Sequence, residues 1–130
     1  MLPVRVLVVE DSADNLMLMK LQLEDLGYRV FTARTGRAAL EAARSQLPDV
    51  LISDLHMPEM DGWELLRLIR ELPALGSIPA IALSGSSFEP ELQQARAAGY
   101  SIHLTKPVDP EDLASAIERL AHAAGQPQTR

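Results

Sequence analysis

The residues best suited to chemistry in this chain are three acids, a hydroxyl and a lysine, each lying within two residues of the end of a short apolar run. They are Glu10, Asp11, Asp54, Ser84 and Lys106. If the apolar runs are parallel strands, their carboxyl ends meet at one edge of a sheet, and these side chains converge there. Carboxylates that crowd together repel one another unless a cation lies between them. Such hard oxygen ligands favour Mg²⁺, because zinc and copper prefer nitrogen or sulfur ligands, which are sparse here.

Phosphoryl transfer to a carboxylate is the reaction that suits this set of side chains. Asp54 would attack phosphorus and form an aspartyl phosphate, a known type of covalent intermediate. Catalysis of such a transfer depends mainly on positioning the phosphoryl group and neutralising its oxygens. Mg²⁺ and Lys106 would neutralise them, and the Ser84 hydroxyl would donate a hydrogen bond to one.

The elements that must position these residues follow from the hydrophobic pattern. Short apolar, β-branched runs alternate with longer segments of helical period, which is typical of β-α units around a parallel sheet. Three runs are almost continuously apolar, which predicts strands covered by helices on both faces. Five units indicate an α/β fold with a doubly wound, five-stranded parallel sheet and five helices. The strands are expected at Val4 to Val9, Arg29 to Ala33, Val50 to Ser53, Ala80 to Leu83 and Ser101 to Leu104.

The helix expected after the first strand has two apolar faces. At about 100° per residue, Met19, Leu23 and Leu26 form a stripe that should face the core. Met17 and Leu21 fall near the opposite side of the helix. Exposed apolar residues can mark a docking face, and scattered ones are also common at surfaces, so Met17 and Leu21 are candidates for partner docking.

Composition narrows the class of protein. With 130 residues, 47% of them hydrophobic, the chain can bury an ordinary core, so one domain is expected over residues 1–123, followed by a flexible tail over 124–130. Against 12 basic residues there are 18 acidic ones, a net charge of −6 that disfavours a binder of nucleic-acid phosphates. The absence of cysteine excludes disulfides and thiolate metal sites. No signal peptide or membrane-spanning run is recognisable, so a cytoplasmic location is expected.

The motifs together resemble one known family. Glu10-Asp11, Asp54 within DLHMPEMDG, Ser84-Gly85 and Lys106-Pro107 occur in this order, each near a predicted strand end. In this respect the chain, from about Val4 to Leu120, is similar to the receiver domains of two-component response regulators. The resemblance implies a flavodoxin-like sheet with strand order 2-1-3-4-5. It also implies a signalling switch that catalyses only its own phosphorylation and dephosphorylation, and is otherwise not an enzyme.

The resemblance assigns roles to individual residues. Asp54 would accept a phosphoryl group from a phosphohistidine of a histidine kinase or phosphotransfer protein, and Mg²⁺ would be bound by Glu10, Asp11, Asp54 and the backbone carbonyl of His56. Lys106 would contact the phosphoryl group and Ser84 would be the switch hydroxyl. The Lys106-Pro107 peptide bond would be cis, which proline makes feasible. The surface of the fourth helix, fifth strand and fifth helix would change on phosphorylation.

Two positions depart from the commonest pattern of the family. Ser84 stands where threonine is frequent, which keeps the hydroxyl. His103 stands where the family usually has tyrosine or phenylalanine, as in many receivers fused to hybrid sensor kinases. His103 is therefore either a switch residue or a half-buried side chain of aromatic size with no signalling role.

Three other classes of protein are alternatives. A phosphatase of the haloacid dehalogenase type also forms an aspartyl phosphate with Mg²⁺, but it needs a second aspartate two residues after the nucleophile, where this chain has His56. A nucleotide- or flavin-binding module would need a GxxxxGK[ST] or GxGxxG loop, and the chain has neither. A degenerate receiver that serves only as a protein-binding scaffold would not need the full set of phosphorylation residues.

Overall fold

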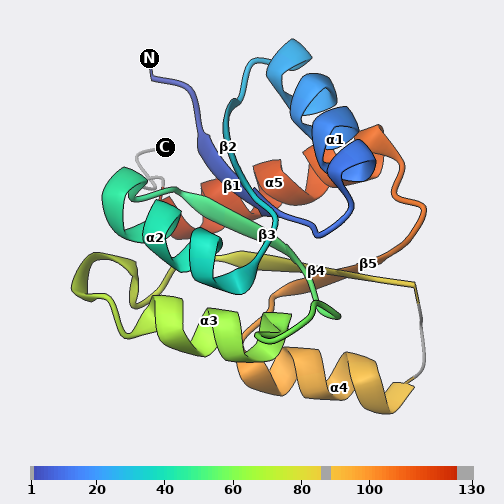
Figure 1. Ribbon diagram of the computed structural model, residues 1–130. Coiled ribbons are helices and arrows are strands. Elements are labelled where there is room, and N and C mark those ends of the chain that lie inside the picture. Colours follow the sequence, from blue (N-terminus) through green and yellow to red (C-terminus); the bar gives the residue numbers. More distant parts are fainter. Residues whose placement is uncertain (1, 86–88, 126–130) are drawn as a thin grey trace.

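Five parallel strands form one sheet in the order β2-β1-β3-β4-β5 in a computed structural model of the chain, which describes residues 2–85 and 89–125 (Figure 1). This is the predicted doubly wound α/β fold with its predicted strand order. The predicted strands agree to within one residue at each end, and three of them extend one residue further at their carboxyl ends. The strands are β1 (Arg5–Val9), β2 (Arg29–Ala33), β3 (Val50–Asp54), β4 (Ala80–Ser84) and β5 (Ile102–Thr105).

Helices cover both faces of the sheet, which explains why its central strands are continuously apolar. Along β1, Val6 and Val8 pack in one core cluster with the first and fifth helices, whereas Leu7 and Val9 pack in the other with the second, third and fourth helices. Figure 1 shows these two helical layers on either side of the strands. The helices are α1 (Ala13–Asp25), α2 (Gly36–Gln46), α3 (Gly62–Arg70), α4 (Glu89–Ala98) and α5 (Pro110–Gly125), with a short 3-10 helix at Pro73–Leu75.

Side chains at the helix starts satisfy the free amides of the first turns. The Ser12 hydroxyl accepts a hydrogen bond from the Asn15 amide at the start of α1. The Asp61 carboxylate accepts one from the Glu64 amide, 2.9 Å away, at the start of α3. Because Ser12 caps α1, Glu10 and Asp11 are not needed for this role. The acids after β1 are thus left available for a site.

One residue of the predicted core stripe on α1 lies at the surface. Met19 and Leu23 are buried as predicted, but Leu26 is 54% exposed. The helix ends at Asp25, and Leu26 is its C-cap, followed by Gly27 with φ of +99°, so the helical period no longer applies there. Leu16, which was not assigned to the stripe, completes the buried face instead.

The carboxyl-terminal boundary falls inside a helix. The predicted domain end at residue 123 lies within α5, which continues to Gly125, and the rest of the predicted tail, 126–130, lies outside the described residues. Within the described part of the chain, every helix is too short or too polar to cross a membrane.

Candidate functional site

The sheet itself positions the candidate site residues. Asp54 is the last residue of β3, and Ser84 is the last residue of the neighbouring strand β4. Backbone hydrogen bonds continue beyond the strands: Lys106 donates its N–H to the Ser84 carbonyl over 2.8 Å, and Glu10 donates its N–H to the Ala33 carbonyl over 3.1 Å. The residues that follow the strands are therefore held in register, at the point between β1 and β3 where the strand order reverses.

Three carboxylates meet at this edge. Glu10, Asp11 and Asp54 each offer an oxygen, and these oxygens all lie within 4.8 Å of one another. Glu10 is 1% exposed and Asp54 4% exposed, while Asp11 is exposed. Burial of two carboxylates so close together is unfavourable without a nearby positive charge.

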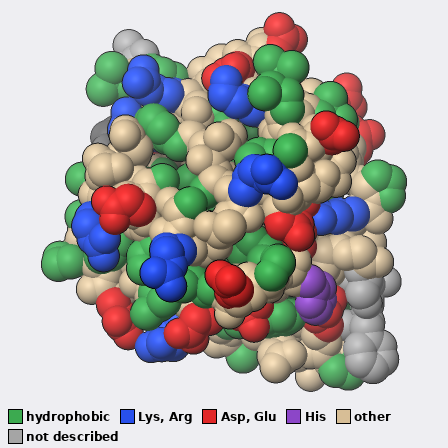
Figure 2. All heavy atoms as spheres, viewed as in Figure 1, with side chains coloured by type: hydrophobic (Ala, Val, Ile, Leu, Met, Phe, Trp, Pro, Cys, Tyr) green, Lys and Arg blue, Asp and Glu red, His purple; other side chains and the backbone are tan. Residues whose placement is uncertain are grey.

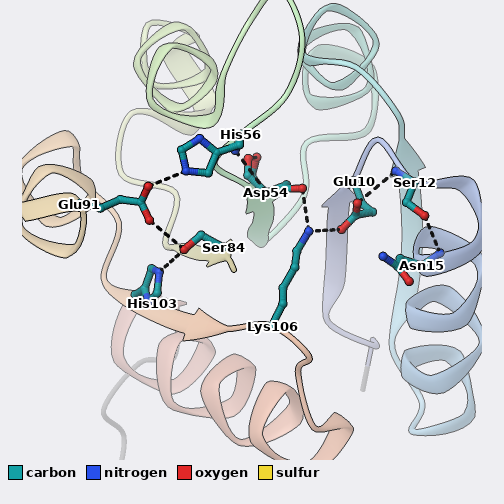
Figure 3. A network of polar contacts seen from close by, with 10 residues as sticks. Glu10, Ser12, Asn15, Asp54, His56, Ser84, Glu91, His103 and Lys106 are labelled. Atoms are coloured by element: carbon teal, nitrogen blue, oxygen red, sulfur yellow. Dashed lines mark hydrogen bonds and ion pairs between the residues drawn. The ribbon is translucent and has the colours of Figure 1, made fainter. Parts of the chain in front are cut away.

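Lys106 supplies one such charge. Its Nζ lies 2.8 Å from Asp54 Oδ2 and 3.0 Å from Glu10 Oε1 (Figure 3). Partial burial lowers the pKa of Lys106, but the hydrogen bond to Asp54 and the negative charges of Asp54 and Glu10 together outweigh this effect, and the pKa lies above its usual 10.5. The lysine is therefore a permanent cation at neutral pH. The peptide bond that follows it, Lys106-Pro107, is cis as expected.

The carboxylate of Glu10 is only half satisfied. Its Oε2 accepts a hydrogen bond from the Ser12 amide over 3.1 Å. Its Oε1 is within ion-pair distance of Lys106, but among the described residues no donor meets hydrogen-bond geometry with it, although it is buried. A buried carboxylate oxygen without a hydrogen bond is costly. The three-carboxylate pocket thus fits a hard divalent cation such as Mg²⁺, which takes oxygen ligands.

A second polar network lies on the α4 side of Asp54 (Figure 3). The Ser84 hydroxyl donates a hydrogen bond to Glu91 Oε1 over 3.1 Å and lies 2.8 Å from His103 Nε2. The other Glu91 oxygen, Oε2, is 2.5 Å from Nε2 of His56. Desolvation lowers the pKa of His103, although the nearby Glu91 charge opposes it, so the neutral ring is favoured. The structure therefore places His103 against the Ser84 hydroxyl, the predicted switch hydroxyl.

Hydrogen bonds and a close backbone contact fix the Asp54 carbonyl and the start of α3 beside it. The Ser53 hydroxyl donates to the Asp54 carbonyl over 2.9 Å, and Tyr100 donates its hydroxyl to the Gly62 carbonyl over 2.7 Å. A Cβ on Gly62 would approach the Asp54 carbonyl to 2.5 Å, so only glycine lets α3 begin this close to β3. Burial raises the pKa of Tyr100 far above its usual 10, which keeps its hydroxyl protonated as a donor.

Sequence reasoning missed three residues that support the site. Arg34 follows β2 directly and donates to the Asp11 carbonyl from Nη2 over 3.1 Å, so the rule of looking just after each strand would have found it. Glu91 and Tyr100 lie outside any strand end. An acid in the first turn of a helix is commonly explained by the helix dipole, so no signal in the sequence set Glu91 apart.

The fold and the site together define a class of protein: a flavodoxin-like α/β domain with an acidic pocket, suited to a divalent cation, at the strand-order reversal. The family model described as response regulator receiver domain matches residues 6–118, and the chain belongs to this family. It is therefore a phosphorylatable signalling switch of two-component systems.

Known proteins similar to this chain include two sensor proteins and a chemotaxis protein. The virulence sensor protein BvgS of Bordetella pertussis is 41% identical over 126 residues, which are 92% of this chain but 10% of BvgS. The chemotaxis protein CheY4 of Vibrio cholerae superposes with a TM-score of 0.87 at 34% identity, covering 91% of this chain and 98% of CheY4. The receiver domain of the sensor histidine kinase PA1611 of Pseudomonas aeruginosa, with a magnesium ion in its active site cleft, has a TM-score of 0.84 at 28% identity, covering 92% and 98%.

Proposed function

We propose that Asp54 accepts a phosphoryl group from a phosphohistidine on a histidine kinase or a phosphotransfer protein. The observation that carries this proposal is the buried Asp54 carboxylate with the Lys106 ammonium 2.8 Å away, beside two further carboxylates. Such a pocket repels anions until a cation is bound, and then attracts the oxygens of a phosphoryl group. The similar receiver domain of the sensor histidine kinase PA1611 supports a kinase-linked donor for this chain.

Mg²⁺ is the cation that the donor set fits. Glu10, Asp11 and Asp54 would hold it through carboxylate oxygens, and the backbone carbonyl of His56 would add a fourth oxygen. Glu10 Oε1 supports this assignment, because it is buried and lacks a hydrogen bond among the described residues beside its ion pair with Lys106. The magnesium ion in the PA1611 receiver also supports it. When bound, Mg²⁺ supplies positive charge that neutralises phosphoryl oxygens.

Transfer proceeds in one displacement at phosphorus. A carboxylate oxygen of Asp54 forms the new P–O bond while the P–N bond to the donor imidazole breaks. The imidazole nitrogen leaves with the bonding electron pair, and a proton on the other ring nitrogen of the donor lets the ring leave as neutral imidazole. Lys106 holds the carboxylate in place and then pairs with the charge of the phosphoryl oxygens, which is the main requirement of such a transfer.

The Ser84 hydroxyl would respond to phosphorylation of Asp54. It ends the strand next to Asp54, so a phosphoryl group there would offer a new, strongly charged acceptor within reach of the β4 end. Reorientation of Ser84 would disturb its contact with His103 on β5 and with Glu91 on α4. The surface formed by α4, β5 and α5 would change as a result, and His103 takes part as the partner of the hydroxyl.

The exposed apolar surface of α1 is proposed as the docking site of the phosphoryl donor. Met17 and Leu21 are 54% and 55% exposed, and Leu18, which the sequence did not single out, is also 55% exposed. Apolar side chains are visible over α1 at the upper right of Figure 2. Since α1 begins three residues after Glu10, a protein seated on this surface would bring its phosphohistidine next to the acidic pocket.

Intact-mass measurement tests the phosphoacceptor. Incubation with Mg²⁺ and acetyl phosphate should add the mass of one phosphoryl group, which alkaline pH then removes. Asp54→Asn should show no adduct, whereas Asp25→Asn, a matched acid-to-amide change at an exposed position of α1, should behave like the natural chain. The proposal is wrong if neither acetyl phosphate nor a phosphorylated kinase labels the chain, which would favour a scaffold. Continuous turnover of phosphate esters would instead favour the phosphatase.

A further inference from the structure

Glu91 ties helix α4 to two other parts of the site. Its carboxylate accepts a hydrogen bond from Ser84 at the end of β4 through Oε1 (3.1 Å) and contacts the His56 ring after β3 through Oε2 (2.5 Å). The Glu91 side chain is 15% exposed, whereas the His56 side chain is 60% exposed. Figure 3 shows Glu91 reaching from α4 between these two partners.

The direction of these hydrogen bonds follows from proton counting. The Ser84 hydroxyl has a single proton, and the structure directs it to Glu91. The 2.8 Å contact between Ser84 Oγ and His103 Nε2 then requires the Nε2 tautomer of His103, with the ring donating. His56 must likewise donate from Nε2, because a carboxylate only accepts. In this arrangement Glu91 accepts the proton of the Ser84 hydroxyl. The Ser84 oxygen is then the acceptor for His103, whose proton must lie on Nε2.

Helix α4 depends on few other anchors. Ala95 is its single fully buried side chain among the described residues, whereas α3 buries Gly62, Leu65, Leu66 and Ile69. Elements with little buried apolar surface open at low free energy. A hydrogen bond to a carboxylate is stronger than one between neutral groups, so the contacts of Glu91 contribute to the docking of the first turn of α4.

We propose that Glu91 is a positioning residue that holds the Ser84 hydroxyl and the His56 ring before phosphorylation, and that phosphorylation of Asp54 frees α4 by redirecting the Ser84 O–H bond. This inference rests on the proposed phosphoacceptor. The phosphoryl group carries about two negative charges near pH 7 and competes with Glu91 for the same single proton. It also repels the Glu91 carboxylate, so both effects act in the direction of release.

Hydrogen exchange in α4 tests the release. In the natural chain, phosphorylation with acetyl phosphate and Mg²⁺ should speed amide exchange in the first turns of α4 by about tenfold, the loss expected for a charged hydrogen bond. Glu91→Ala should show this faster exchange without phosphorylation, and phosphorylation should add little. Glu89→Ala is the matched control, because Glu89 is an exposed acid in the same turn. It should leave both rates unchanged.

The NMR chemical shifts of the His103 ring nitrogens distinguish two roles of Glu91: positioning of the Ser84 hydroxyl, and support of helix α4 alone. In Glu91→Ala the Ser84 hydroxyl no longer donates to a carboxylate at position 91, so His103 should no longer favour the Nε2 tautomer. In Glu89→Ala, His103 should still favour it. Equal exchange and equal shifts in the two variants would overturn the inference, as would unchanged α4 exchange in a chain whose labelling is confirmed by mass. Absence of labelling instead contradicts the phosphoacceptor, and the unphosphorylated comparison still decides the role of Glu91.

Discussion

At the level of single residues, Lys106 determines how two buried carboxylates can coexist. It pairs with Asp54 and Glu10 at 2.8 and 3.0 Å, and its own side chain is 28% exposed. Removing one partner from a buried ion pair costs more than the pair contributes, because the remaining charge is left without compensation. Both the stability of the chain without Mg²⁺ and its reactivity toward a phosphoryl donor should therefore depend on Lys106.

We predict that Lys106→Met, which keeps the apolar stem, lowers the free energy of unfolding in the absence of Mg²⁺ by about 1–3 kcal/mol. In the background of Asp54→Asn the same change should cost less, with a coupling energy of about 1 kcal/mol or more. Urea unfolding of the four variants in chelator measures both quantities.

The exposed pair of Lys20 and Glu24 on α1 provides the control for this cycle. Its nitrogen and oxygen are also 3.0 Å apart, but the side chains are 34% and 40% exposed. Solvent-exposed pairs contribute less than about 1 kcal/mol, so Lys20→Met should change stability little. Lys106→Met and Lys20→Met with equal effects, or a Lys106–Asp54 cycle without coupling, would contradict the assigned role.

The functional residues differ in how far the sequence could identify them. Asp54 and Ser84 end strands and Lys106 follows one closely, so the parallel sheet brings them together without detailed knowledge of packing. Glu91 is different, because its contact with Ser84 arises from where the surface of α4 meets β4. That contact depends on tertiary packing, to which a sequence pattern of period 3.6 has no access.

At the level of elements, α1 has one buried apolar face and one exposed apolar surface. Met19 and Leu23 anchor the helix to the sheet, and Met17, Leu18 and Leu21 remain at the surface. We predict that replacing Met17 and Leu21 together by alanine slows phosphotransfer from a phosphorylated histidine protein at least tenfold, because interface anchors of this size typically contribute more than about 1 kcal/mol. Labelling by acetyl phosphate should be unaffected. The two rates are measured by intact mass over time.

Leu26 offers a matched control on the same helix. It is 54% exposed, like Met17, but it lies at the end of α1 remote from Glu10. Leu26→Ala should leave both phosphotransfer and acetyl phosphate labelling intact. If the double variant loses labelling by both donors, the α1 surface acts on the site itself, and the docking role is wrong.

The boundaries of elements were the least predictable feature of the fold. The central strands β1, β3 and β4 were correctly predicted because their apolar runs must be buried on both faces, which leaves little freedom in register. The end of α1 was not, since Leu26 fits the apolar stripe and only the backbone turn at Gly27 takes it out of the helix. A helical period indicates a face, but capping geometry decides where that face stops.

At the scale of the whole molecule, the net charge of −6 conceals a local concentration of negative charge at one end of the sheet. The carboxylates come from the ends of β1 and β3, at the centre of the strand order, and Lys106 follows β5 at its edge. The site is therefore complete only when the sheet is formed. A cation that binds this site binds the folded chain and not the unfolded one, so its binding is coupled to global stability.

We therefore predict that Mg²⁺ raises the free energy of unfolding of the whole domain, by about 2.7 kcal/mol at a concentration 100 times its dissociation constant. The single tryptophan, Trp63, reports that constant, because its ring meets the His56 ring edge-on with centroids 5.4 Å apart, beside the proposed carbonyl ligand. Glu10→Gln should weaken Mg²⁺ binding and reduce the stabilisation at a fixed concentration, and Asp25→Asn should not. Coincident urea unfolding curves with and without Mg²⁺ for the natural chain would show that these carboxylates do not form a cation site.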